Sequence, residues 1–134
     1  MWIVSPCCGL LSIVLADDPA TGLPATDLLM IRARSRDHLV LLKSQHPILA
    51  DVEIQRSRPG LDYGWRLVVD RITLIQVFAE MASQLSWRNV KAEAELNKQE
   101  IGPEYVRAYH EVHEAFVRAE RREGAAQEDD PPRP

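Results

Sequence analysis

The sequence predicts an α+β domain in which a single antiparallel sheet of about four strands packs with two to three helices, as a ferredoxin-like or permuted ferredoxin-like sandwich. Segments rich in Ile, Val and Leu with a period of two predict the strands, and segments with a period near 3.6 predict the helices. Pro, Gly, Asp and Ser mark the boundaries between them. With 134 residues, of which 46% are apolar, the chain is expected to form one domain around one core.

Two strands are predicted before the first helix. Residues 2–16 are rich in Ile, Val and Leu and are expected to form a bent strand or a hairpin that turns at residues 5–9. A stretch with Pro, Gly and Asp follows, which is typical of a loop. Residues 27–34 predict the second strand. Its alternation places Leu29, Ile31 and Ala33 on one face and Met30, Arg32 and Arg34 on the other.

A helix and two further strands follow. Residues 35–46 predict the helix, because Ser35 suits the N-cap position and Pro47 lies just past the end. Residues 48–57 and 61–69 predict the third and fourth strands, which a turn with Pro and Gly separates. The period of two in the fourth strand predicts one core face that consists of Leu61, Tyr63, Trp65, Leu67 and Val69.

The C-terminal half is predicted to be helical. Asp70 is expected to cap a helix over residues 71–85, and a short helix precedes a last one over residues 103–122. Residues 1–122 then form a single α+β domain, and residues 123–134 are expected to be a disordered polar tail. The core-facing residues expected in the first of these helices are Leu74, Ile75, Phe78, Met81, Ala82 and Leu85.

Composition disfavours several functional classes. The net charge of −4 is unsuited to general nucleic-acid binding, which needs a basic surface to contact phosphates. The N-terminal apolar run lacks the basic start of a signal peptide and is too short and broken to span a membrane, so no membrane association is expected. Cys7 and Cys8 are adjacent, which fits a reducing cytoplasm better than a disulfide framework.

No nucleotide-binding or hydrolase motif occurs, so no cofactor is predicted and an enzyme is disfavoured.

The stretch YHEVHEAF, residues 109–116, contains a candidate metal site. His110 and His113 lie three residues apart on the predicted last helix, with Glu114 one turn from His110. The HExxH spacing is absent and this helix offers no obvious fourth ligand, so a solvated helix edge is the alternative interpretation. The apolar stripe of the same helix, predicted to face the core, consists of Tyr105, Tyr109, Val112 and Phe116.

Arginine and aromatic residues of the predicted strands form a candidate binding surface. Aromatic side chains beside arginines can stack on bases while the cations contact phosphates. The alternative is structural: Tyr63 and Trp65 pack in the core, and Arg66 pairs with an acidic residue. The candidate binding residues are Arg32, Arg34, Tyr63, Arg66, Trp87, Asn89 and Lys91, with Arg88 as a further cation.

Several segments resemble a family of small uncharacterised bacterial proteins. Its members open with W-[IL]-V and F-x-S-I-V, continue with V-R-A-R and D-Y-x-[YF]-R, and carry N-F-K before a last helix with Y-x-x-V-W. The matching residues of this chain are Trp2, Val4, Ser12, Ile13, Val14, Arg32, Ala33, Arg34, Asp62, Tyr63, Arg66, Asn89, Lys91, Tyr109 and Val112, and Trp65 replaces the usual Tyr or Phe. His113 stands where the family has Trp, which argues against a shared histidine site. The resemblance implies a single-domain fold and indicates no activity.

The leading functional prediction is a non-enzymatic cytoplasmic protein that binds a protein partner or a second copy of itself. An uncovered sheet face or an unpaired edge strand would supply the docking surface. The first alternative is nucleic-acid binding or processing through the arginine and aromatic residues. The second alternative is a small metal-dependent enzyme that uses His110, His113 and Glu114.

Overall fold

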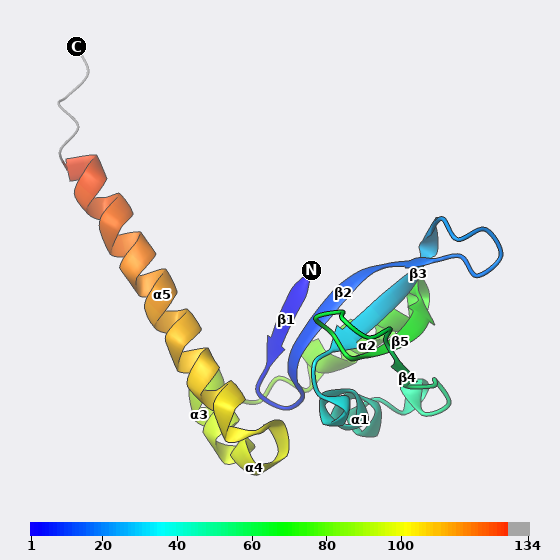
Figure 1. Ribbon diagram of the computed structural model, residues 1–134. Helices are drawn as coiled ribbons and strands as arrows, with labels where there is room; N and C mark the ends of the chain where they lie inside the picture. The colour runs from blue at the N-terminus through cyan, green and yellow to red at the C-terminus, as the bar shows by residue number, and fades with distance from the viewer. Residues whose placement is uncertain (129–134) are drawn as a thin grey trace.

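The body of the protein is built on an antiparallel sheet (Figure 1). The structure is a computed structural model that describes the backbone of residues 1–128 and the side chains of residues 1–120. The strands are β1 Trp2–Ser5, β2 Gly9–Asp17, β3 Pro24–Ala33, β4 Gln55–Arg56 and β5 Trp65–Asp70, in the spatial order β1-β2-β3-β5-β4. The predicted α+β class and single antiparallel sheet are confirmed, although the described residues form five strands rather than about four. The additional strand arises because the N-terminal segment forms the hairpin β1–β2.

Five α-helices lie in the described part of the chain, more than the two to three predicted. They are α1 Arg36–Gln45, α2 Arg71–Ser83, α3 Val90–Leu96, α4 Lys98–Ile101 and α5 Pro103–Glu128, and a 3-10 turn covers Pro47–Leu49. The predicted caps are confirmed: Ser35 Oγ accepts from the Asp37 N–H at 3.2 Å, and Asp70 Oδ1 accepts from the Thr73 N–H at 2.8 Å. No helix within residues 1–128 is both long and apolar enough to cross a bilayer.

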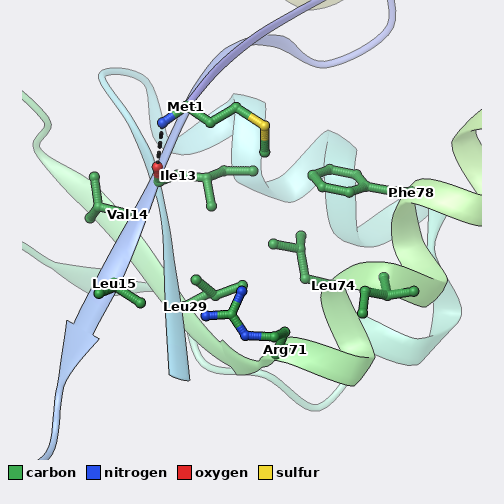
Figure 2. Close-up of a pocket in the computed structure, with 9 residues that line it drawn as sticks. Met1, Ile13, Val14, Leu15, Leu29, Arg71, Leu74 and Phe78 are labelled. Atoms are coloured by element: carbon green, nitrogen blue, oxygen red, sulfur yellow. Dashed lines mark hydrogen bonds between the residues drawn. The ribbon is translucent and has the colours of Figure 1, made fainter. Parts of the chain in front are cut away.

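Helices cover one face of the sheet. α1 packs on β2, β3 and β5, and α2 packs on β3 and β5. The core between them consists of Cys8, Leu11, Ile13, Ile31, Ala33, Leu39, Leu42, Leu49, Leu67, Val69, Leu74 and Val77. Because α2 reaches only the central strands, an apolar hollow of about 330 Å³ remains beside β2, where Met1, Ile13, Leu29, Leu74 and Phe78 meet (Figure 2). The opposite face carries none of the described helices, and it is called the open face below.

A buried histidine holds α1 against the turn between β1 and β2. His38 is 1% exposed, and its Nε2 lies 3.1 Å from the carbonyl oxygen of Ile101 in α4. The edge of its ring meets Tyr105 of α5 at 4.3 Å between centroids. Its other side lies against the backbone of Gly9, which has a φ of +79°. A Cβ at Gly9 would lie 2.4 Å from His38 Cε1, so this position requires glycine for both conformation and space.

The C-terminal helices form a second, smaller core beside the sheet. It consists of Ala94, Ile101, Val106 and Tyr109, with Leu41 of α1 packed against it. The Tyr109 hydroxyl donates to the Ser5 carbonyl at 2.6 Å, which ties α5 to the end of β1. The two cores therefore meet around α1 and the β1–β2 turn.

The predicted third and fourth strands are wrong in extent. A 3-10 turn at Pro47–Leu49 occupies the start of the predicted third strand, and the strand itself contains only two residues, Gln55 and Arg56. The fourth strand begins at Trp65, because residues 57–64 form a loop closed by the bond from the Ser57 N–H to the Gly64 carbonyl at 2.9 Å. Leu61 is consequently 59% exposed, and the ring of Tyr63 lies by the open face instead of in the helix-covered core.

The predicted core faces of two helices also need correction. In α2, Leu74 and Val77 are buried, whereas Ile75 and Ala82 are exposed, because the contact with the sheet covers a narrower stripe than predicted. Leu85, predicted to be in the same stripe, lies past the end of α2 at Ser83 and is exposed. In α5, Tyr109 is buried as predicted, but Val112 and Phe116 are 48% and 67% exposed.

The helix α5 leaves the body of the protein after Tyr109 (Figure 1). It continues to Glu128, past its predicted end at residue 122, so residues 123–128 are helical where a disordered tail was expected. The rest of that predicted tail, residues 129–134, lies outside the described residues.

Gly9→Ala is expected to lower the free energy of unfolding by about 3 kcal/mol. The positive φ accounts for about 1 kcal/mol and the overlap with the His38 ring for about 2 kcal/mol more. Gly60→Ala is the matched control, because Gly60 has a φ of +87° and a Cβ there would meet no described atom within 4 Å. Urea denaturation measures both losses, and equal losses would contradict the close packing of His38 on Gly9.

Candidate functional site

Four polar side chains form a row across the open face. Ser12 of β2 is the partner of Arg32 in β3, Arg32 is the partner of Arg66 in β5, and Arg66 is the partner of Gln55 in β4. Residues that lie directly opposite each other in antiparallel strands point to the same side of the sheet. The register therefore gathers four side chains from four strands into one line.

Arg32 and Arg66 form the centre of this row and are called the arginine pair below. Like charges on directly opposed residues repel each other. In the part of the chain that the structure describes, neither guanidinium lies within 4.0 Å of a carboxylate oxygen. Each Nε is buried and has no hydrogen-bond acceptor among these residues, although one Arg32 Nη donates to Ser12 Oγ at 2.9 Å. The arginine pair therefore keeps two positive charges and unused donors close together.

The ring of Tyr63, in the loop between β4 and β5, packs against two arginines, Arg32 of the arginine pair and Arg34. Arg32 Cζ lies 4.8 Å from the centre of its ring, and Arg34 Cζ lies 5.4 Å from it. Both distances are within the range of a cation–π interaction, and this interaction stabilises the two guanidinium groups over the ring. Since Tyr63 is only 9% exposed, its ring is a support for arginines instead of a free aromatic surface.

The arginine pair lines a cavity of about 930 Å³ between the open face and the loop that carries Tyr63. The next row of the cavity wall is apolar, because Met30 and Val68 are cross-strand partners there. Asp17 lines the far end, five residues along β2 from Ser12, which corresponds to about 16 Å at about 3.3 Å per residue. The cavity thus runs from a cationic end across an apolar middle to an acidic end.

This cavity has the groups to bind an anion. Each guanidinium can donate two parallel hydrogen bonds to a carboxylate or phosphate group, and two guanidinium groups hold such a ligand better than one. Its lining, taken over the described residues, includes no His, Cys or Lys that would serve as a general base or nucleophile. Its carboxylates belong to Asp17, Asp18 and the exposed loop residue Asp62. The cavity therefore combines anion-binding guanidinium groups with three carboxylates.

The predicted binding residues divide into two groups. Arg32, Tyr63 and Arg66 line the cavity and Arg34 lies against the same tyrosine, so the structure brings four of them together. Trp87, Asn89 and Lys91 do not line the cavity; they lie in the segment before α3 and in its first turn.

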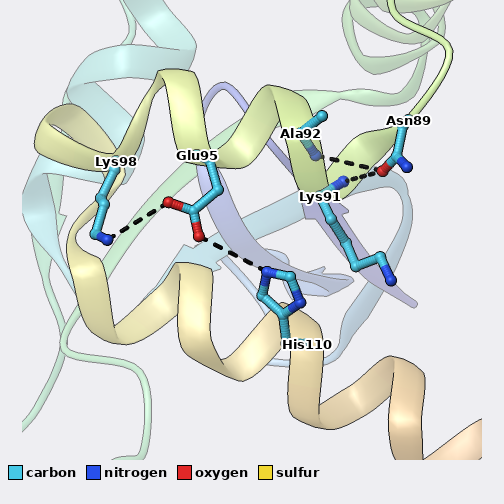
Figure 3. Close-up of polar contacts among 6 residues, drawn as sticks. All are labelled: Asn89, Lys91, Ala92, Glu95, Lys98 and His110. Atoms are coloured by element: carbon cyan, nitrogen blue, oxygen red, sulfur yellow. Dashed lines mark hydrogen bonds and ion pairs between the residues drawn. The ribbon is translucent and has the colours of Figure 1, made fainter.

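Asn89 has a structural role as the N-cap of α3 (Figure 3). Its Oδ1 accepts from the backbone N–H groups of Lys91 at 2.9 Å and Ala92 at 3.3 Å.

The predicted metal ligands do not form a metal site. His110 is half exposed, and its Nε2 lies 3.7 Å from Glu95 Oε1, while Lys98 Nζ lies 3.4 Å from the other oxygen of Glu95 (Figure 3). His113 and Glu114 are exposed on α5. Within the described residues, no group of three His, Cys, Asp or Glu side chains is placed to hold a metal ion. His110 therefore belongs to a surface network in which Glu95, not Glu114, supplies the carboxylate.

The sequence interpretation missed Ser12, Gln55 and Trp2, which extend the polar row. Trp2 of β1 is the partner of Ser12 and is 74% exposed at the end of the row. The alternation within each strand predicts which face of the sheet these side chains occupy. To place them beside Arg32, the register between the strands is also needed. The sequence does not specify this register, because residues 2–16 could be interpreted as one bent strand or as a hairpin.

The two cysteines are not a reactive dithiol. Cys8 is fully buried, and burial raises the pKa of its thiol to about 11. Burial also raises the pKa of the Cys7 thiol, with further contributions from the negative charges of Glu93 and Glu100. Both thiols are therefore protonated at neutral pH, and the thiol is a weaker nucleophile than the thiolate.

Comparisons with known proteins add no family assignment. The chain gave no match to a protein-family model, and no significant match to a curated protein or a solved structure.

Arg66→Met is expected to raise the free energy of unfolding by about 0.5 kcal/mol in low-salt buffer, because it removes a like-charge neighbour and keeps an apolar side chain. Sulfate is expected to stabilise the wild type more than the variant at equal ionic strength. Urea denaturation with sodium sulfate or sodium chloride measures both effects. Arg118→Met, at an exposed site on α5, is the control and should change neither. A loss of stability in Arg66→Met, with an unchanged sulfate response, would identify the pair as a packing feature.

Proposed function

We propose that this protein is a non-enzymatic interaction module that binds an acidic segment of a protein partner on its open face. One observation carries the proposal: Arg32 and Arg66 are adjacent and have no carboxylate partner among the described residues, on the sheet face that no described helix covers. A protein rarely places two like charges side by side without a partner for them, because the arrangement lowers stability. A ligand carboxylate would reverse this cost by accepting from both guanidinium groups.

The surroundings of the arginine pair favour a peptide over a small ion. Met30 and Val68 offer apolar contact to side chains that flank the acidic group. Trp2 is exposed on the same face, and Trp and Arg are the residue types that most often dominate the energy of protein interfaces. The supporting features are thus a charged anchor point and apolar contacts on either side of it.

Nucleic-acid binding is the second candidate, and the exposed Trp2 beside an arginine row is the observation in its favour. Three observations weigh against it. Tyr63 is too covered to stack on a base. Asp17 and Asp18 line the same cavity as the arginine pair, and their charges would repel a phosphate backbone. The whole chain carries a net charge of −4.

Two finer expectations also remain proposals. The permuted ferredoxin-like description is supported by the order β2-β3-β5-β4 and by the connection β3–α1–β4–β5–α2, with β1 as an additional edge strand. A cytoplasmic location is supported by the two free cysteines, Cys7 and Cys8.

The binding proposal is tested by nuclear magnetic resonance of the arginine Nε–H groups. The probe is the capped tripeptide acetyl-Leu-Glu-Leu-amide, with the Gln tripeptide as its uncharged match. The Glu peptide is expected to shift the Arg32 and Arg66 signals in a saturable way. The Gln peptide should bind about tenfold more weakly, because a charge-assisted hydrogen bond contributes about 1.5 kcal/mol or more.

Arg32→Met and Arg66→Met should each weaken binding of the Glu peptide by a similar factor, and Arg118→Met should leave it unchanged. A short single-stranded RNA serves as the competing probe. Equal affinity for the Glu and Gln peptides, or strong salt-dependent RNA binding through the same two arginines, would contradict the proposal.

A further inference from the structure

The outer edge of β1 presents backbone groups that β2 does not use. The Met1 amine donates to the Ile13 carbonyl at 2.8 Å (Figure 2). The Ile13 N–H donates to the Met1 carbonyl, also at 2.8 Å. In an antiparallel ladder such hydrogen-bonded pairs recur every second residue, so Ile3 also faces β2 with its backbone groups. The N–H and C=O groups of Trp2 and Val4 therefore point to the opposite side, where no other described strand lies.

The two edges of the sheet differ in how they are protected. At one edge, β4 contains two residues, one of which is Arg56, and Arg58 and Pro59 follow it. Short length, charge and proline are the features that keep an edge strand from pairing with another chain. The other edge, β1, has four residues without a charge, and its Trp2 and Val4 side chains are 74% and 46% exposed. β1 lacks these protective features.

We propose that β1 pairs with β1 of a second copy, antiparallel and about a two-fold axis through Ile3, to form a continuous ten-stranded sheet. Directly opposed residues must point to the same face, so their residue numbers must add to an even value when the two strands are identical. A sum of six places Trp2 opposite Val4 of the second copy and Ile3 opposite Ile3 of the second copy. This register uses the whole of the exposed edge.

This register satisfies the outward backbone groups of both strands. Trp2 and the opposed Val4 exchange two N–H to C=O hydrogen bonds, and the two-fold axis repeats them, which gives four bonds. The Ile3 residues form the close, non-hydrogen-bonded pair on the axis. Each Trp2 side chain lies against a Val4 side chain on the open face, which is a favourable aromatic and β-branched pair. The edge is thus complementary to itself.

The helix α5 meets β1 at one end of the strand. The Tyr109 hydroxyl of α5 donates a hydrogen bond to Ser5 at the end of β1, and α5 diverges from the strand toward the N-terminus (Figure 1). The two-fold axis keeps both open faces on the same side, so the two arginine pairs share one surface. Their β3 strands are five strand spacings apart, about 24 Å at about 4.8 Å per spacing.

Analytical ultracentrifugation of the untagged chain tests the pairing. The wild type is expected to shift from its monomer mass of 15.2 kDa toward twice that mass in the micromolar range, since a small interface gives a weak dimer. Val4→Pro removes an N–H that β2 does not use, so it should keep the fold and weaken dimerisation at least tenfold. Val4→Lys should act in the same way if the proline variant does not fold, and Ile72→Lys, at an exposed residue of α2, should dimerise like the wild type.

Cross-linking tests the register. In a Cys7→Ser background, Ile3→Cys should form an intermolecular disulfide on mild oxidation, because the two positions are opposed across the axis. Val4→Cys should cross-link much more slowly, because two copies of that position are displaced along the strands. A wild type that stays monomeric up to millimolar concentration, a Val4→Pro dimer as stable as the wild type, or equal cross-linking at both positions would overturn the proposal.

Discussion

The register between β2, β3 and β5 is the constraint on which the rest of the structure depends. It places Ile31 beside Leu67 on the covered face, where α1 and α2 bury both residues. Because side chains alternate along a strand, the same register places Arg32 beside Arg66 on the open face. The helices that complete the core thus hold the two arginines together from behind. A shift of this register by one residue would move the core side chains of the shifted strand to the open face, and would also separate the two arginines.

Much of the fold could be predicted from the sequence because its signals are local. The caps at Ser35 and Asp70 and the alternation of residues 28–33 depend on neighbouring residues, and the structure has them as expected. The predictions that failed depend on tertiary contacts. Tyr63 continues the period of two of β5, yet the loop that begins at Ser57 takes it away from the covered face. Val112 and Phe116 continue the stripe of α5, but the body of the protein ends before them.

The candidate site shows the same division. Arg32 and Arg66 stood out in the sequence as arginines on predicted strands, although only the register shows that they are neighbours. Asn89 and Lys91 were grouped with them for their chemistry, whereas Asn89 serves as a helix cap. His110 and His113 have a spacing that suits metal binding, but a site also requires ligands from other elements. The described residues supply only Glu95, which is held by Lys98 as well.

A double-mutant cycle between Arg32 and Arg66 tests the central claim most directly, which is that two unneutralised charges are held together on the open face. The free energies of unfolding of the wild type, Arg32→Met, Arg66→Met and the double variant are compared at low and high ionic strength. Because the repulsion is relieved only once, the change in the double variant should be about 0.5 kcal/mol less favourable than the sum of the two single changes, and salt should reduce this difference. Additive effects at low ionic strength, or an attractive coupling, would contradict the account.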